Sequence, residues 1–186
     1  WADRGGFIAM KGNKFCINEV CGPDEYKPGV NNNCYTNYMA KFNMEFGVKV
    51  ANIMMEEFPK EYKELSGKIQ LKDDEINYWQ YCADEMYLPY NEDLGIHPQD
   101  DSFLYKEDLD VDSLPEEEIP LVRNWHPLNI WRYQICKQAD VILLMFLLGH
   151  FFDKDIKKAN YDYYEPRTTH DSSLSSCIFS IVAAEV

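Results

Sequence analysis

A long amphipathic helix is the clearest feature of the hydrophobic pattern in this chain. Between residues 33 and 58, apolar residues recur at steps of three and four, which places them on one face of an α-helix. Pro59 follows directly and is a common stop signal. The apolar face consists of Tyr35, Met39, Phe42, Phe46, Val50, Ile53 and Met54. We therefore predict a helix over this segment that ends at Pro59.

Further helices are predicted on both sides of the middle of the chain. One follows Asp73 or Asp74, either of which could cap it, and ends before Pro89. Another covers residues 130–152 and is apolar nearly all round in its second half, so other elements should cover it on every side. Its apolar run is too short to span a bilayer.

The last two predicted helices lie near the end of the chain. One covers residues 154–164 and ends at Pro166, and the other begins near Ser172. Near the beginning, residues 7–10 and 14–17 flank a Lys-Gly-Asn turn and predict a short β-hairpin. The fold class is therefore all-α with a small β-hairpin.

Residues 90–127 form a long, polar segment that is interrupted by prolines. Loops of this length in compact domains are more often functional than idle. Tyr105, Trp125 and His126 are its candidate contacts to a bound molecule, although a purely structural loop explains the segment equally well.

Composition and charge narrow the range of partners. The net charge of −14 argues against nucleic acid or an anionic membrane surface. Thirteen Tyr, ten Phe and four Trp suit the flat platforms of sugar-binding clefts, but they suit an ordinary core as well. The six cysteines show neither a CxxC motif nor metal-ligand spacing. We expect reduced thiols in a cytoplasmic protein, with no metal and no cofactor.

Two adjacent acids, Asp24 and Glu25, lie in a Gly-Pro turn between an extended segment and the long helix. A carboxylic acid that donates a proton to a leaving oxygen must be held on a fixed turn and partly desolvated. A surface turn is the simpler explanation when this motif is taken alone. The motif and the segment after it read Cys21-Gly22-Pro23-Asp24-Glu25-Tyr26 and Val30-Asn31-Asn32-Asn33-Cys34-Tyr35-Thr36-Asn37.

Two later clusters carry polar groups that could bind a ligand. Lys137 and Gln138 are placed near the start of a buried helix, where they either point donors at sugar hydroxyls or reach back to solvent. The segment 167–175 enters the last helix with hydroxyls and an imidazole, which together with free backbone N–H groups suit an anion. Asp171 or Ser172 could also simply cap that helix.

These motifs, in this order and along the whole chain, resemble the inverting α-glucosyl disaccharide phosphorylases of glycoside hydrolase family 65. Members of that family act on maltose, trehalose and kojibiose. The resemblance implies part of an (α/α)6 barrel, namely its later helices, because a complete barrel has twelve. Residues 1–186 would then be the C-terminal portion of the catalytic barrel, with its remainder and the flanking β-sandwich domains outside this chain. The four motifs are residues 17–26, 32–37, 137–141 and 163–175.

The resemblance also implies roles for particular residues. Glu25 corresponds to the general acid, and Lys137 and Gln138 to residues that contact the glucosyl unit. His170, Ser172 and Ser173 correspond to the phosphate pocket, and Arg167 either contacts phosphate or orders the loop. The implied partners are a disaccharide and inorganic phosphate, and the full-length parent is expected to be a homodimer.

The implied reaction is phosphorolysis with inversion, which gives β-glucose 1-phosphate and a released sugar. An inverting hydrolase needs a second carboxylate to activate water, roughly 6.5–9.5 Å from the first. Phosphate arrives as an anion and needs no base. Two alternatives remain: an α-glucoside hydrolase of the same fold, either trehalase-like or specific for glucosyl conjugates, and a non-catalytic helical carbohydrate-binding fragment. The chain alone, as part of a barrel, is expected to be inactive.

Overall fold

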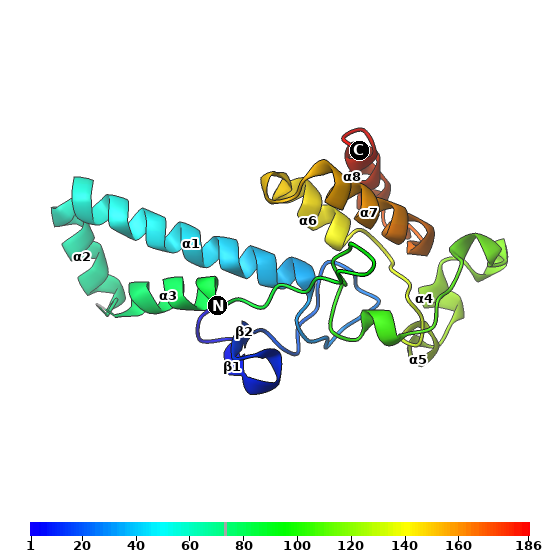
Figure 1. Cartoon of the computed structure of the whole chain (residues 1–186), viewed down its shortest axis with the longest axis horizontal. Helices are drawn as coiled ribbons and strands as arrows, with labels where there is room; N and C mark the ends of the chain where they lie inside the picture. The colour runs from blue at the N-terminus through cyan, green and yellow to red at the C-terminus, as the bar shows by residue number, and fades with distance from the viewer. Residues whose placement is uncertain (73) are drawn as a thin grey trace. The chain divides into compact units, whose positions relative to one another are not determined.

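The computed structural model describes residues 1–72 and 74–186, and these are mainly helical with one two-stranded sheet. The chain forms two compact units (Figure 1). The first unit comprises residues 1–17 and 37–87, and the second comprises residues 18–36 and 88–186. None of the helices in the described ranges is long and apolar enough to cross a bilayer. All six cysteines are free thiols.

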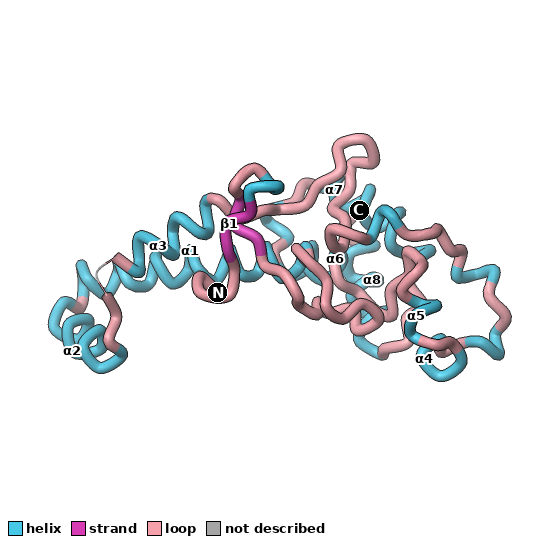
Figure 2. Tube along the Cα trace, turned by 90° about the horizontal axis from the view of Figure 1, so that it is seen from below, coloured by secondary structure: helices cyan, strands magenta, loops and turns pink. Residues whose placement is uncertain are grey.

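The first unit contains the predicted hairpin and the long helix. Strands β1 (Gly6–Ile8) and β2 (Lys14–Cys16) pair antiparallel, with Phe7 opposite Phe15, and are the magenta part of the tube in Figure 2. A 3₁₀ turn, η1 (Ala9–Lys11), connects them. The hairpin is therefore confirmed, with strands slightly shorter than predicted. Helix α1 (Cys34–Glu57) covers the predicted segment almost residue for residue.

Helices α2 (Pro59–Ile69) and α3 (Glu75–Asp84) complete the first unit. Pro59 was predicted only as a stop, but it also begins α2, because proline needs no N–H donor in the first turn of a helix. Asp74 occupies the N-cap position of α3 without a capping hydrogen bond from its side chain. The other candidate cap, Asp73, lies outside the described residues.

The second unit has its main core where three helices pack together, α6 (Val141–Leu147), α7 (Lys154–Tyr164) and α8 (Ser173–Ala183). Leu144, Met145 and Val182 are fully buried there. The remaining elements of this unit are short: η2 (Phe103–Tyr105), η3 (Val111–Ser113), η4 (Glu116–Glu118), α4 (Leu121–Asn124), α5 (Pro127–Ile130), η5 (Gly149–Phe151) and η6 (Glu165–Arg167).

The prediction of one helix over residues 130–152 was wrong in its first half, because α6 begins only at Val141. The backbone groups of Cys136 and Lys137 form hydrogen bonds with residues 167–171 instead. They are therefore not available for the hydrogen bonds within a helix. Among the residues that the structure describes, the expected cover of this helix on every side is incomplete. Phe146 and Leu147 on α6 are 39% and 45% exposed.

The long polar segment 90–127 packs around a small core that it shares with Tyr26 and with residues 130–135. Tyr26, Leu121, Ile130 and Ile135 are buried together, and Trp125 packs against them. The indole Nε1 of Trp125 donates to Glu118 Oε2 at 2.7 Å, so this candidate contact has a structural role. The other two candidates are exposed: Tyr105 almost completely, and His126 with its Nδ1 accepting from the Leu128 N–H.

Candidate active site

The Gly-Pro turn buries one of its two acids and exposes the other. Asp24 is almost completely buried, whereas the Glu25 side chain is 62% exposed. Gly22 allows this turn to approach the interior closely, since a Cβ atom there would lie 2.4 Å from Asn33 Nδ2 and from Asp140 Oδ2. The expectation that Glu25 is partly desolvated is therefore not met within this chain.

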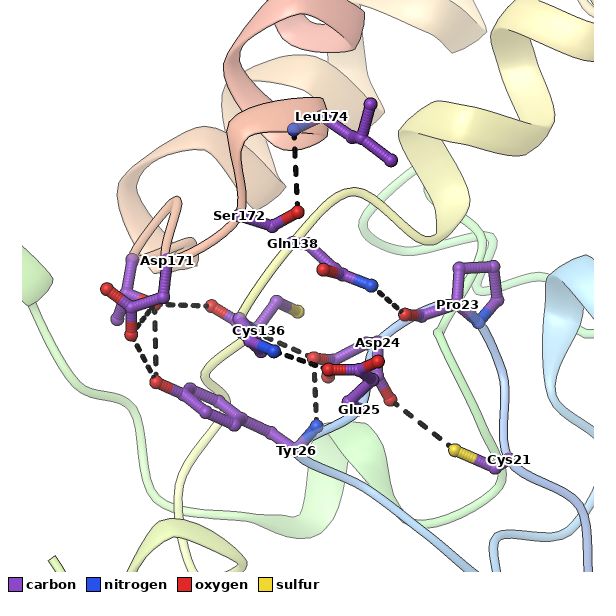
Figure 3. Close-up of polar contacts among 12 residues, drawn as sticks. Cys21, Pro23, Asp24, Glu25, Tyr26, Cys136, Gln138, Asp171, Ser172 and Leu174 are labelled. Atoms are coloured by element: carbon purple, nitrogen blue, oxygen red, sulfur yellow. Dashed lines mark hydrogen bonds and ion pairs between the residues drawn. The ribbon is translucent and has the colours of Figure 1, made fainter. Parts of the chain in front are cut away.

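Asp24 connects three segments that are distant in the sequence. Its Oδ1 accepts from the backbone N–H of Tyr26 at 3.2 Å (Figure 3) and from that of Lys137 at 2.8 Å. Its Oδ2 accepts from Gln99 Nε2 at 2.9 Å. Burial raises the pKa of Asp24, and these hydrogen bonds from Gln99, Lys137 and Tyr26 oppose that rise because they favour the carboxylate. The turn of residues 22–25, which we call the acid turn, is thereby fixed to the segment that carries Lys137 and Gln138.

A second buried acid, Asp140, lies directly behind the turn. Its Oδ2 accepts from the Asp24 backbone N–H at 3.2 Å, and Asn33 Nδ2 donates to both of its oxygens at 3.2 Å. Asn33 also begins α1, because its Oδ1 accepts from the Thr36 N–H at 2.9 Å. Burial, followed by the nearby charge of Asp24, raises the pKa of Asp140 to about 8.

We predict a characteristic pH dependence from this acid. A carboxyl pKa of about 8 in the folded protein, against about 4 when unfolded, gives stability that is fully present below pH 4 and is lost as pH rises through 8. Asp140→Asn should remove this dependence. The melting temperature of the wild-type parent protein, relative to that of the variant, should fall by about 5 °C between pH 5 and pH 8 in thermal unfolding scans.

Asp162→Asn is the control for that prediction. Asp162 lies exposed on α7, where its Oδ2 accepts from Lys158 Nζ at 2.7 Å. This variant should keep the wild-type change of melting temperature with pH. A constant difference between wild type and Asp140→Asn across the same pH range would contradict the assignment of a retained proton to Asp140.

Lys137 and Gln138 turn their side chains toward the acid turn. Lys137 Nζ forms an ion pair with Glu25 Oε2, and Gln138 Nε2 donates to the Pro23 carbonyl. Both residues are half-buried. The structure thus brings three of the predicted site residues together, Glu25, Lys137 and Gln138. Lys137 has three N–H donors, so two more are available for a ligand beside the ion pair.

The segment 167–171 runs alongside Cys136 and Lys137. The Cys136 N–H donates to the Arg167 carbonyl at 2.8 Å, the Thr169 N–H to the Cys136 carbonyl at 2.9 Å, and the Asp171 N–H to the Lys137 carbonyl at 3.1 Å. These bonds place the residues before α8 next to the residues that hold Asp24. The acid turn and the predicted anion-binding segment therefore lie in one region of the second unit.

His170 faces the first turn of α8. Its Nδ1 lies 2.9 Å from Ser175 Oγ, which also accepts from the Ala139 N–H at 3.1 Å. The ring contacts Phe179 edge to face, and burial lowers the pKa of His170. The backbone of His170 is left-handed, with φ of 53°, which turns the chain into the helix. The His170 ring is therefore held in a fixed orientation, in surroundings that disfavour its charged form.

The two predicted serines differ in position. Ser172 is the N-cap of α8, with its Oγ accepting from the Leu174 N–H at 3.4 Å, which decides between the two candidate caps. Ser173 is the first helical residue and is exposed. Arg167 is occupied elsewhere: its Nη2 donates to Asp108 Oδ2 at 2.7 Å and its guanidinium lies over the Tyr163 ring. Arg167 therefore connects Asp108 to the segment before α8.

Sequence reasoning did not mention Gln99 or Cys136 as parts of this region, and it included Asn33 and Asp140 only as members of motifs, without a role of their own. Gln99 joins Asp24 to Cys136, whose Sγ donates to Gln99 Oε1 at 2.9 Å. Gln99 comes from the polar segment 90–127, where nothing local marks it as buried. Asn33 could have been found, because an asparagine directly before an amphipathic helix is a capping signal.

The comparisons with known proteins agree along the whole chain. The model of the glycosyl hydrolase family 65 central catalytic domain matches residues 1–186. The chain is 60% identical to the alpha,alpha-trehalose phosphorylase of Thermoanaerobacter brockii and 47% identical to that of Geobacillus stearothermophilus, in each case over 100% of this chain and 24% of the relative. It is 39% identical to the kojibiose phosphorylase of Halothermothrix orenii over 94% of this chain and 22% of that protein.

A solved structure from the human microbiome, named for kojibiose phosphorylase, matches this fold with a TM-score of 0.88 and 32% identity. The match covers 99% of this chain and 25% of that one. The chain thus spans about a quarter of the length of the curated relatives that it matches. These matches establish that the chain belongs to the central catalytic domain of glycosyl hydrolase family 65.

Proposed function

We propose that the protein containing this chain is a disaccharide phosphorylase, which transfers the glucosyl unit of an α-linked glucosyl disaccharide to inorganic phosphate. The products would be β-glucose 1-phosphate, formed with inversion, and a released sugar. The observation that carries the proposal is the hydrogen-bonded association of the acid turn, the Lys137-Gln138 segment and the segment before α8. The family and its phosphorylase relatives support the same chemistry.

In the proposed mechanism, Glu25 donates its proton to the glycosidic oxygen as the bond to the anomeric carbon breaks. Lys137 and Gln138 would bind hydroxyls of the glucosyl unit. The ion pair between Lys137 and Glu25 holds the two side chains next to each other before the sugar binds. Binding of the sugar would then separate this ion pair: Lys137 donates to sugar hydroxyls instead, and Glu25 takes up a proton from water before it acts as the acid.

Phosphate would attack the anomeric carbon from the opposite face, held by His170, Ser172 and Ser173. When the Ser175 hydroxyl donates to His170 Nδ1, the ring proton of the neutral imidazole is on Nε2. His170 can then donate that proton in a hydrogen bond to a phosphate oxygen. The N-terminus of α8 adds backbone N–H groups and a favourable dipole. Phosphate is already an anion, so neither a base nor a cofactor is needed.

We further propose that this chain is the C-terminal portion of an (α/α)6 barrel, whose other helices come from the rest of the parent protein. The exposed apolar side chains of α6, together with the exposed Glu25, support this, because the missing helices would cover both. On this account the chain alone is inactive and the full-length parent, as a homodimer, is active. Six free thiols are consistent with our proposal of a cytoplasmic protein.

The direct test is to incubate the full-length parent with trehalose, kojibiose, maltose and nigerose, each with and without phosphate. We expect cleavage of one disaccharide that requires phosphate and forms one glucose 1-phosphate for each phosphate consumed. Trehalose is the first choice, since two of the relatives are trehalose phosphorylases. Cleavage at the same rate without phosphate would indicate a hydrolase, and no cleavage at all would contradict the proposal.

A further inference from the structure

A side-chain hydrogen bond connects Tyr26 with Asp171, which is the residue after His170. Tyr26 follows Glu25 directly, and its hydroxyl donates to Asp171 Oδ2 at 2.5 Å. Thr169 Oγ1 donates to the same carboxylate oxygen at 3.0 Å. Figure 3 shows the Tyr26 side chain reaching from the acid turn to Asp171. The two ends of the proposed site are therefore joined by a side-chain contact as well as by the backbone.

Both the ring and the backbone of Tyr26 are held in place. Its ring is buried with Leu121, Ile130 and Ile135, and its backbone N–H donates to Asp24 Oδ1. Burial, followed by the hydrogen bond to Asp171, raises the pKa of Tyr26, so the hydroxyl keeps its proton and stays a donor. Loss of the hydroxyl alone would leave the ring packed, which makes Tyr26→Phe a clean substitution.

Asp171 is an unusual neighbour for a phosphate pocket, since a carboxylate repels a phosphate dianion. It lies between His170 and the N-cap Ser172. Two hydroxyl donors on one of its oxygens hold the carboxylate toward Tyr26 and disperse its charge. Its backbone N–H is fixed as well, by the bond to the Lys137 carbonyl. Without the Tyr26 hydroxyl, the Asp171 carboxylate would be held less firmly, and its negative charge would repel the bound phosphate more strongly.

We propose that Tyr26 is a positioning residue for phosphate. It fixes the segment that binds phosphate relative to the acid turn, and it keeps the charge of Asp171 away from the bound anion. This inference rests on the proposed phosphorylase function. It goes beyond that function by assigning a residue that touches neither the sugar nor phosphate.

The test compares Tyr26→Phe with Tyr164→Phe in the full-length parent. Tyr164 is a suitable control because it is also buried and loses one hydrogen bond, the 2.7 Å contact from its hydroxyl to the His97 carbonyl. We expect the KM for phosphate to rise about tenfold in Tyr26→Phe, with kcat and the KM for the disaccharide changed by less than about threefold. Tyr164→Phe should leave both KM values unchanged.

A second substitution separates positioning from general damage. Adding Asp171→Asn to Tyr26→Phe removes the unrestrained charge, so the KM for phosphate should return to within about threefold of the wild-type value. A purely structural defect would not be rescued by this change. Thr169→Val, which removes the other hydroxyl donor, should raise the KM for phosphate in the same direction and provides the measurement if Tyr26→Phe does not fold.

The outcomes also separate this inference from the proposed function. A wild-type parent that cleaves disaccharides only with phosphate, together with an unchanged KM for phosphate in Tyr26→Phe and Thr169→Val, would overturn the inference alone. If the wild-type parent shows no phosphorolysis, the proposed function fails. Calorimetric titration with inorganic phosphate then decides the role of Tyr26: about tenfold weaker binding to Tyr26→Phe supports it, and equal or absent binding overturns it.

Discussion

Replacing Glu25 by Gln in the full-length parent should lower the rate of disaccharide phosphorolysis by about 10³-fold or more. General acid catalysis contributes about 10²–10⁴-fold, and a sugar leaving group depends on it strongly because its alkoxide is a poor leaving group. Gln keeps the size of the side chain but has no proton to donate in this way. The measurement is kcat for the disaccharide at saturating phosphate. The thermal midpoint should stay within about 2 °C of wild type, since the side chain is 62% exposed.

Glu107→Gln is the matched control for this experiment. Glu107 is 63% exposed, almost the same as Glu25, and it also forms an ion pair, with Arg132 at 3.4 Å. This variant should retain the wild-type kcat. An activated substrate offers a second check: α-glucosyl fluoride has a leaving group that needs no proton, so Glu25→Gln should cleave it with phosphate at a rate near that of wild type. Normal turnover of the disaccharide by Glu25→Gln would remove Glu25 from its proposed role.

The fold could be predicted from the sequence wherever local patterns determine it. The apolar spacing predicted α1 nearly at its observed bounds, the segment that ends at Pro166 was predicted as α7 at its observed bounds, and the turn between two apolar runs predicted the hairpin. Residues 131–140 were predicted helical and are not, because Cys136 and Lys137 bond to residues 167–171. Partners thirty residues away leave no local signal, and an apolar run alone does not distinguish a helix from a buried extended segment.

The candidate site was predictable mainly through the resemblance of its motifs to a family. The sequence places Asp24 and Glu25 side by side and gives no reason to treat them differently. Only the tertiary structure shows that one is buried among donors and the other faces solvent. The partners of Asp24 illustrate the same limit, because Gln99 and Lys137 come from segments far along the chain. Burial of this kind depends on long-range contacts, which composition and periodicity do not encode.

Asp24→Ala should destabilise the region around the acid turn, by about 3–5 kcal/mol in free energy of unfolding. The substitution leaves three buried donors without their acceptor, namely the N–H groups of Lys137 and Tyr26 and the amide of Gln99. It also opens a cavity beside Asp140. Hydrogen exchange of the full-length parent is the most local measurement. The amides of Tyr26 and Lys137 should exchange faster in the variant, and the thermal midpoint should fall.

Glu25→Ala, one residue along the chain, is the control that isolates this effect. It removes a carboxylate of the same turn but breaks only an exposed ion pair with Lys137, and such pairs contribute about 0–1 kcal/mol. Amide exchange at Tyr26 and Lys137 should therefore be unchanged in Glu25→Ala, although phosphorolysis is lost. Asp24→Ala should show faster exchange and should lose activity because the turn is no longer held. Unchanged exchange in Asp24→Ala would mean that other contacts, and not this buried carboxylate, hold the acid turn to the Lys137-Gln138 segment.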